Sequence, residues 1–163
     1  MKKIAVLLLA AVAGLSAQTA ETVYFRALLL PDNEVPPTNI EASGTATIIA
    51  HLVRGTSGEI VDGSVDFLVA YRFPEGQTFR GLHIHSGTAG VNGPVTIDTG
   101  ISGANPVVDE TGVGMIHRQA QVMPDDTAGL ATLRGMLNNP SRYYVNMHTT
   151  QFPGGAIRGQ LQR

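Results

Sequence analysis

The stretch GLHIHSGTAG (residues 81–90) decides the fold class that we predict, because apolar and polar side chains alternate through its first five residues. Successive side chains of a strand point to opposite faces of a sheet, so Leu82 and Ile84 share one face while His83 and His85 share the other. The glycine-rich segment after them is typical of a turn or loop and does not resemble a phosphate-binding loop. This stretch therefore predicts a strand with one apolar face and one face that carries two histidines.

Two segments near the C-terminus have the same alternation. In RYYVNMHT (residues 142–149) and AIRGQL (residues 156–161), every second side chain is polar. An ordinary solvated sheet face carries mainly Thr, Lys, Glu and Ser, whereas these faces carry imidazole, amide and guanidinium groups. The polar face that we predict is formed by His83, His85, Tyr144, Asn146, His148, Arg158 and Gln160.

The rest of the chain consists of short β-type runs separated by Gly, Pro, Asn and Asp. One segment, residues 124–137, has leucines at helical spacing and aspartates at its start, and it predicts a short helix in a connection. The pattern as a whole predicts a single all-β domain, a sandwich or a barrel. The strands that we expect are 22–30, 44–53, 59–73, 81–86, 93–99, 112–122, 142–149 and 156–162.

The first 17 residues have the composition of a secretory signal peptide. Two lysines precede a run of about a dozen apolar residues, and small residues follow it. The run is shorter than the roughly 20 apolar residues that span a bilayer. We therefore expect export to the periplasm or the medium, with cleavage after Ala17 and without a stable membrane anchor.

The composition of the remaining 146 residues excludes several kinds of chemistry. They contain neither lysine nor cysteine, which excludes Schiff bases, thiolate ligands and disulfides. Their net charge is 9 − 13 = −4 without a basic cluster, which argues against nucleic acid as a partner. Nor does the chain contain the G-x-S-x-G motif of a serine nucleophile.

The histidines of the polar face support two hypotheses. His83, His85 and His148 suit zinc or copper as ligands, with Glu34 or Asn146 nearby. Alternatively, the cluster is structural: the histidines bond neighbouring loops, and Arg158 donates to loop carbonyls or to Glu34 and so holds the DNEVPP segment (residues 32–37) on the sheet. His51 and His117 have no partner nearby in the sequence, and we interpret both as ordinary strand residues.

These motifs resemble, in order, the landmarks of the CHRD domain family, which is named for chordin. The resemblance covers residues 22–162. Many members have glutamate before the Ile-Arg-Gly run, whereas this chain has Ala156, so a carboxylate that could pair with Arg158 is missing there. The landmarks are NEVPP (33–37), ASG (42–44), HIH (83–85), GVNGPV (90–95), YVNMHT (144–149) and PGGAIRGQL (153–161).

The resemblance implies an exported, immunoglobulin-like β-sandwich or barrel, and it carries no established enzymatic activity. We therefore expect a non-catalytic binding or interaction domain whose partner is a protein or another extracellular ligand. The loops GTAGVNG (87–93) and QFPGG (151–155) are the expected contact surfaces. A zinc or copper site at His83, His85 and His148 is the alternative function.

Overall fold

The chain folds into two antiparallel β-sheets and one short α-helix. The computed structural model describes residues 18–163, and the predicted signal peptide (residues 1–17) lies outside the described residues. The elements are β1 (Thr19–Leu29), η1 (Pro31–Asn33), β2 (Ser43–Arg54), β3 (Ile60–Arg72), β4 (Gln77–Ser86), β5 (Val95–Asp98), β6 (Val107–Asp109), β7 (Val113–Val122), α1 (Thr127–Asn138), η2 (Pro140–Arg142), β8 (Tyr143–Thr149) and β9 (Ile157–Gln160).

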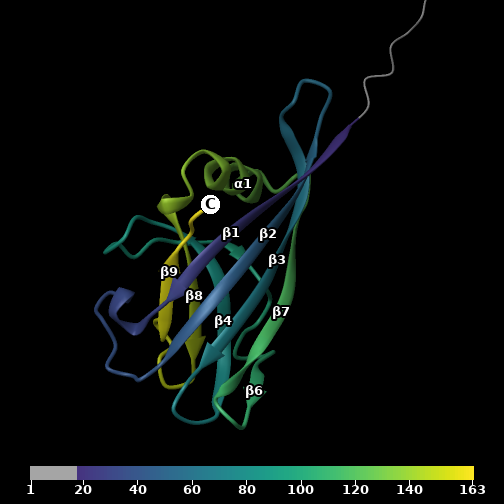
Figure 1. Cartoon of the computed structure of the whole chain (residues 1–163). Coiled ribbons are helices and arrows are strands. Elements are labelled where there is room, and N and C mark those ends of the chain that lie inside the picture. The colour runs from purple at the N-terminus through teal and green to yellow at the C-terminus, as the bar shows by residue number, and fades with distance from the viewer. Residues whose placement is uncertain (1–17) are drawn as a thin grey trace, which may run out of the picture.

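The two sheets pack face to face, and they do not close into a barrel within the described residues (Figure 1). The first sheet has the strand order β1-β2-β3-β7. In the second sheet the order is β5-β4-β8-β9, and β6 pairs with β4 beside this path. Two isolated bridges, Arg26 to Gln162 and Leu30 to Arg158, join β1 to the C-terminal segment. The prediction of an all-β sandwich with a short helix is thus confirmed.

The core lies between the sheets and follows from the alternation along the strands. Side chains from β1, β2 and β3 meet those from β4, β8 and β9, and the inward residues are almost fully buried. Burying side chains of this size stabilises a fold by about 1.5–3 kcal/mol each. Those at 0% exposure include Phe25, Leu29, Ile48, Phe67, Val69, Leu82, Ile84, Val145, Met147 and Ile157.

Helix α1 lies across one end of the sandwich (Figure 1). The carboxylate of Asp126 caps its N-terminus by accepting a hydrogen bond from the Gly129 amide. Leu133 and Met136 are buried on its inner face, which explains why a helix weakened by two glycines forms here. No described helix is long and apolar enough to cross a membrane.

Strand β6 was missed by the sequence prediction, and β5 begins at Val95, two residues later than expected. Strand β6 has only three residues, Val107–Asp109, so its alternation is too short to identify. Strand β4 begins at Gln77, earlier than expected. Its first residues offer a free edge, and β6 forms by pairing with this edge. The additional strand β6 and the longer β4 extend the second sheet, and they leave the predicted polar face unchanged.

The predicted polar face lies on the outside of the second sheet, but loops cover it. Asn92 donates to the carbonyl oxygen of Val35, and the Thr38 hydroxyl donates to that of Ala156. Through these hydrogen bonds the segments after β1, after β4 and after β8 are joined above the sheet. The polar residues are therefore largely shielded from solvent, whereas the residues on an ordinary outer face of a sheet are exposed to it.

Candidate metal centre

Strands β4 and β8 bring the three histidines together. In their antiparallel register, Gly81 faces His148, His83 faces Asn146, and His85 faces Tyr144. Directly opposite residues have Cβ atoms roughly 5 Å apart, and next-but-one positions on one strand are about 7 Å apart. Two neighbouring strands thus place His148 beside His83 and His85 on one small area of the sheet, although it lies more than 60 residues after them in the sequence.

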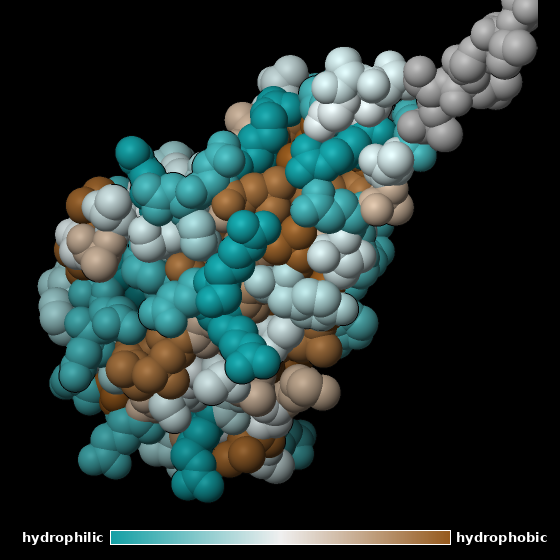
Figure 2. All heavy atoms as spheres, turned by 45° about the horizontal axis from the view of Figure 1, so that its top comes forward, coloured by the Kyte–Doolittle hydropathy of each residue, from teal (hydrophilic) through white to brown (hydrophobic). Residues whose placement is uncertain are grey.

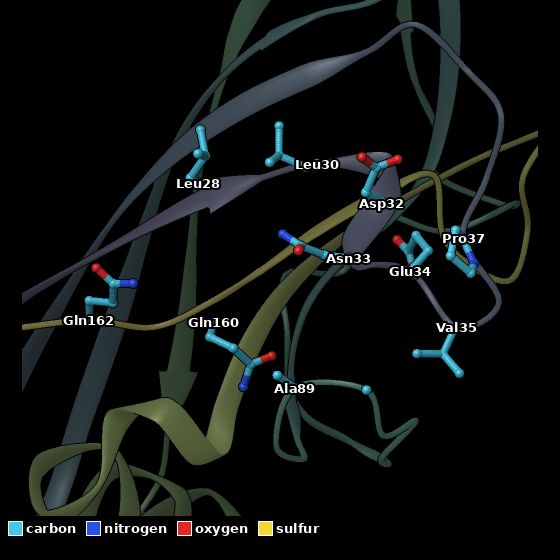
Figure 3. Close-up of a pocket in the computed structure, with 11 residues that line it drawn as sticks. Leu28, Leu30, Asp32, Asn33, Glu34, Val35, Pro37, Ala89, Gln160 and Gln162 are labelled. Atoms are coloured by element: carbon cyan, nitrogen blue, oxygen red, sulfur yellow. The ribbon is translucent and has the colours of Figure 1, made fainter.

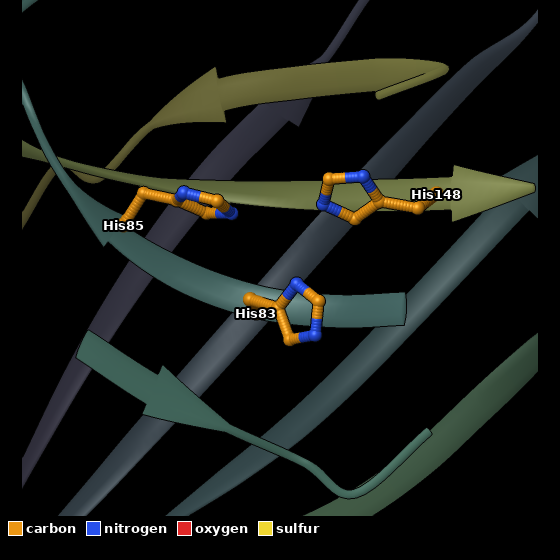
Figure 4. A group of neighbouring side chains, drawn as sticks. All are labelled: His83, His85 and His148. Carbon is orange, nitrogen blue, oxygen red and sulfur yellow. The ribbon is translucent and has the colours of Figure 1, made fainter. Parts of the chain in front are cut away.

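The three imidazole rings turn toward a common centre. The ring centroids are 5.7 Å apart for His83 and His85, 5.0 Å for His83 and His148, and 5.7 Å for His85 and His148. One nitrogen from each ring lies within 4.8 Å of the other two, and Figure 4 shows these nitrogens pointing toward one another. Among residues 18–163, no other group of this kind is present.

The second nitrogen of each ring faces an acceptor. His85 Nδ1 donates to the carbonyl oxygen of Gly93 at 2.9 Å, and His148 Nδ1 donates to that of Pro153 at 3.1 Å. His83 Nε2 lies 3.5 Å from a carboxylate oxygen of Asp98. Because a carbonyl oxygen only accepts, Nδ1 of His85 and of His148 must carry the proton, and the carboxylate favours the proton on Nε2 of His83.

The remaining nitrogens are His83 Nδ1, His85 Nε2 and His148 Nε2. All three are buried, and none has a hydrogen-bond partner in the described structure. Buried polar atoms without a partner are uncommon in folded proteins and need an explanation. Three of them from one cluster form a set of inward-facing lone pairs, and the acceptors behind the rings fix each ring as acceptors behind metal-bound histidines do.

The environment keeps the rings neutral. Burial lowers the pKa of His83 and that of His85 below the ordinary value of 6.5. Burial, together with the charge of His83, lowers the pKa of His148 to about 4. Neutral imidazole is the form that binds metal, so at neutral pH all three lone pairs are available.

The donor set fits zinc or copper. Zinc–nitrogen bonds of about 2.0–2.1 Å place the nitrogens of a three-histidine site roughly 3.4 Å apart. The present separations, up to 4.8 Å, are larger. Binding would therefore draw the nitrogens closer together, while the number and the kind of donors already suit these ions. The residues thus fit a three-coordinate site or a tetrahedral site with one open position.

A second buried polar group lies beside the histidines. Arg158 is 1% exposed, and its guanidinium lies 4.6 Å from the centre of the Tyr144 ring. Its Nε donates to the Asn33 carbonyl and lies 3.9 Å from a carboxylate oxygen of Glu34, and its Nη1 donates to Asn92 at 2.9 Å. Arg158 therefore holds the segments after β1 and after β4 on the sheet.

Glu34 is 5% exposed, and burial raises its pKa to about 7, although Arg158 and a hydrogen bond with Asn146 oppose this shift. Its Oε1, Asn146 Oδ1 and Arg158 Nη2 are buried without partners. The structure thus brings Glu34, Asn146 and Arg158 into one group next to the histidines. The carboxylate of Glu34 is not part of the histidine group itself.

A cavity of about 600 Å³ opens beside this group (Figure 3). Its walls come from the end of β1, the DNEVPP segment, the loop after β4 and the C-terminal segment. Leu28, Leu30, Val35 and Ala89 give it an apolar lining, and Asp32 and the amides of Asn33, Gln160 and Gln162 add polar groups. None of the three histidines lines this cavity.

The other two histidines lie in strands β2 and β7, on the outer face of the first sheet. Asp66 lies between them: its carboxylate is 2.9 Å from His51 Nε2 and 3.5 Å from His117 Nε2. Neither Asp66 nor Asp98, which lies behind His83, was predicted from the sequence. Strand pairing could have found Asp98, because its Cα is the direct partner of His83 in β5.

The model of the CHRD domain family matches residues 25–161, which confirms the resemblance seen in the sequence motifs. No curated protein and no solved structure matches the chain. The match includes all three histidines, both carbonyl acceptors behind them, and Glu34 and Arg158. The complete candidate site therefore belongs to the matched region.

Proposed function

The chain belongs to the CHRD domain family, and we propose that it is an exported, non-catalytic binding domain that holds a zinc or copper ion at His83, His85 and His148. One observation carries the proposal: three buried imidazole nitrogens have no partner and lie within 4.8 Å of one another. A metal ion would satisfy all three at once. The signal-like residues 1–17 support the export of the chain.

The test is metal-dependent stability of the untagged protein. A ligand that binds only the folded state at 100 times its Kd stabilises it by about 2.7 kcal/mol. For a domain of this size that is roughly 5–10 °C in Tm. We expect zinc or copper to raise the Tm of the wild type by this amount. We expect no such rise for His148→Gln.

His117→Gln is the matched control, because His117 is an exposed strand histidine outside the cluster. It should respond to metal as the wild type does. A wild-type protein that purifies without metal and shows no Tm shift with either ion would refute metal binding. In that case a metal-free His148→Gln protein that melts below the wild type would support the structural role of the cluster.

The cavity in Figure 3 favours a second candidate function, the binding of a protein or another extracellular ligand at the loop surface. Leu28 lines the cavity and is 58% exposed, whereas Tyr24, on the same face of β1 and 60% exposed, lies outside it. A partner recovered from the medium or periplasm should be lost with Leu28→Glu and kept with Tyr24→Glu. Equal recovery by both variants would exclude the cavity as the contact surface.

A further inference from the structure

The histidine site contains no negatively charged donor. Among the described residues, only the three imidazoles contribute to the group. The nearest acid in contact with a ligand ring, Asp98, lies against His83 Nε2, on the side of the ring away from the unpartnered Nδ1. An ion in this site would therefore keep its full charge, because neutral nitrogens do not compensate it.

The site is also removed from solvent. Each unpartnered nitrogen exposes less than 1 Å². The cost of moving an ion from water into such a low-dielectric site is large. In the Born description it rises with the square of the charge, so a divalent ion costs about four times as much as a monovalent ion of the same size. Burial without an anionic ligand therefore favours the ion of lower charge.

The charges around the site also favour an ion of lower charge. The guanidinium of Arg158 lies over the Tyr144 ring, 4.6 Å from its centroid, and the Tyr144 ring stacks on the His85 ring with centroids 4.9 Å apart. The carboxylate of Glu34 lies next to Arg158 and offsets its charge. Asp98, which contacts His83, has a side chain that is 61% exposed, so no buried negative charge in contact with the ligand rings is left to balance a divalent ion.

We propose that the site selects monovalent copper, Cu(I), over Zn(II) and binds it with three ligands, Nδ1 of His83 and Nε2 of His85 and His148. This inference rests on the proposed metal-binding function and names its ion. Structural zinc sites have four ligands in a tetrahedron, and among the described residues no Cys, Asp, Glu or further His joins the three histidines of this group as a fourth ligand. Cu(I) accepts three nitrogen donors without a fourth ligand, and it requires no anionic ligand.

The experiment compares the two affinities in the untagged protein at pH 7.5. Cu(I) is generated with ascorbate without oxygen and competed with bicinchoninate, and Zn(II) is competed with a chromophoric chelator. We expect the Kd for Cu(I) to be at least a hundredfold below that for Zn(II). His148→Gln should weaken Cu(I) binding at least a hundredfold, whereas His117→Gln should bind as the wild type does. Circular dichroism of both variants checks that they are folded.

X-ray absorption of the copper-loaded protein provides a second readout, and we expect three nitrogen neighbours and no sulfur. Zinc binding as tight as Cu(I) binding, or a four-coordinate or sulfur-containing copper shell, would overturn this inference and leave the proposed metal function intact. A protein that binds neither ion would overturn both. The two failures are therefore distinguishable.

Discussion

The phenol ring of Tyr144 lies almost parallel to the imidazole of His85, with ring centroids 4.9 Å apart and an angle of 9° between the planes. Both side chains bond to the same residue: the Gly93 carbonyl accepts from His85 Nδ1, and the Gly93 amide donates to the Tyr144 hydroxyl. The stack and Gly93 together restrict rotation of the His85 ring. The orientation of Nε2 toward the other two histidines follows from this restraint.

Removing the Tyr144 ring should therefore weaken metal binding without removing a ligand. We expect Tyr144→Leu to lower the metal affinity by about 10- to 100-fold, the usual effect of losing a group that orients a ligand. Tyr144→Phe keeps the stack and loses one hydrogen bond, so its affinity should stay near that of the wild type and its free energy of unfolding should fall by about 1 kcal/mol. Chelator competition and urea unfolding measure the two effects. Equal metal affinities for the Tyr144→Leu and Tyr144→Phe proteins would show that the stack does not orient His85.

The faces of the strands could be predicted from the sequence, because alternation depends only on residue spacing. Leu82 and Ile84 enter the core, and His83 and His85 take the opposite face, as the pattern indicates. The grouping of His148 with them needed only the assumption that its strand neighbours theirs.

The surroundings of the rings could not be predicted in the same way. The carbonyls of Gly93 and Pro153 come from loops whose paths depend on tertiary contacts, and backbone atoms carry no sequence signal. The contact of Arg158 with the DNEVPP segment was expected under the structural hypothesis, and the structure shows it at the Asn33 carbonyl and at Glu34. The additional hydrogen bond to Asn92 was not predicted, because the path of the loop after β4 depends on tertiary contacts.

Gly81 provides a test of ring placement. A Cβ atom at this position would lie 2.6 Å from His83 Cε1 and 3.0 Å from His148 Cδ2, closer than such atoms normally approach. We expect Gly81→Ala to push the two rings from their positions and to weaken metal binding by at least tenfold. Gly154→Ala is the control, since a Cβ there meets no heavy atom within 4 Å. Chelator competition compares the two variants, and equal affinities would contradict the role of Gly81.

The interaction of Arg158 with Glu34 can be measured with a double-mutant cycle. At pH 8, Arg158→Met leaves the buried Glu34 carboxylate without its cation and should lower the free energy of unfolding by about 3–5 kcal/mol. In a Glu34→Gln background no buried charge is left behind, so the same substitution should cost at least about 1 kcal/mol less. Urea unfolding of the four proteins gives the coupling. Strictly additive effects would mean that the 3.9 Å contact carries no interaction energy.

The raised pKa of Glu34 also leads us to expect that the free energy of unfolding depends on pH. Its pKa is raised by burial from 4.5 to about 7, so between these values the folded state keeps a proton that the unfolded state has released. The free energy of unfolding should therefore fall as the pH rises from about 4.5 to about 7, by at most roughly 3 kcal/mol, and then stay level.

Glu34→Gln cannot titrate at this position, so the difference in unfolding free energy between wild type and variant isolates the effect of Glu34. The three histidines act in the opposite direction, because their lowered pKa values reduce stability as the pH falls below 6.5. Both proteins contain these histidines, and their contribution cancels in the difference. Urea unfolding from pH 5 to pH 8 should show the advantage of the wild type shrinking, or its disadvantage growing, as the pH rises. Parallel curves over this range would show that Glu34 ionises equally in the folded and unfolded states, and that its burial is offset by Arg158 and Asn146.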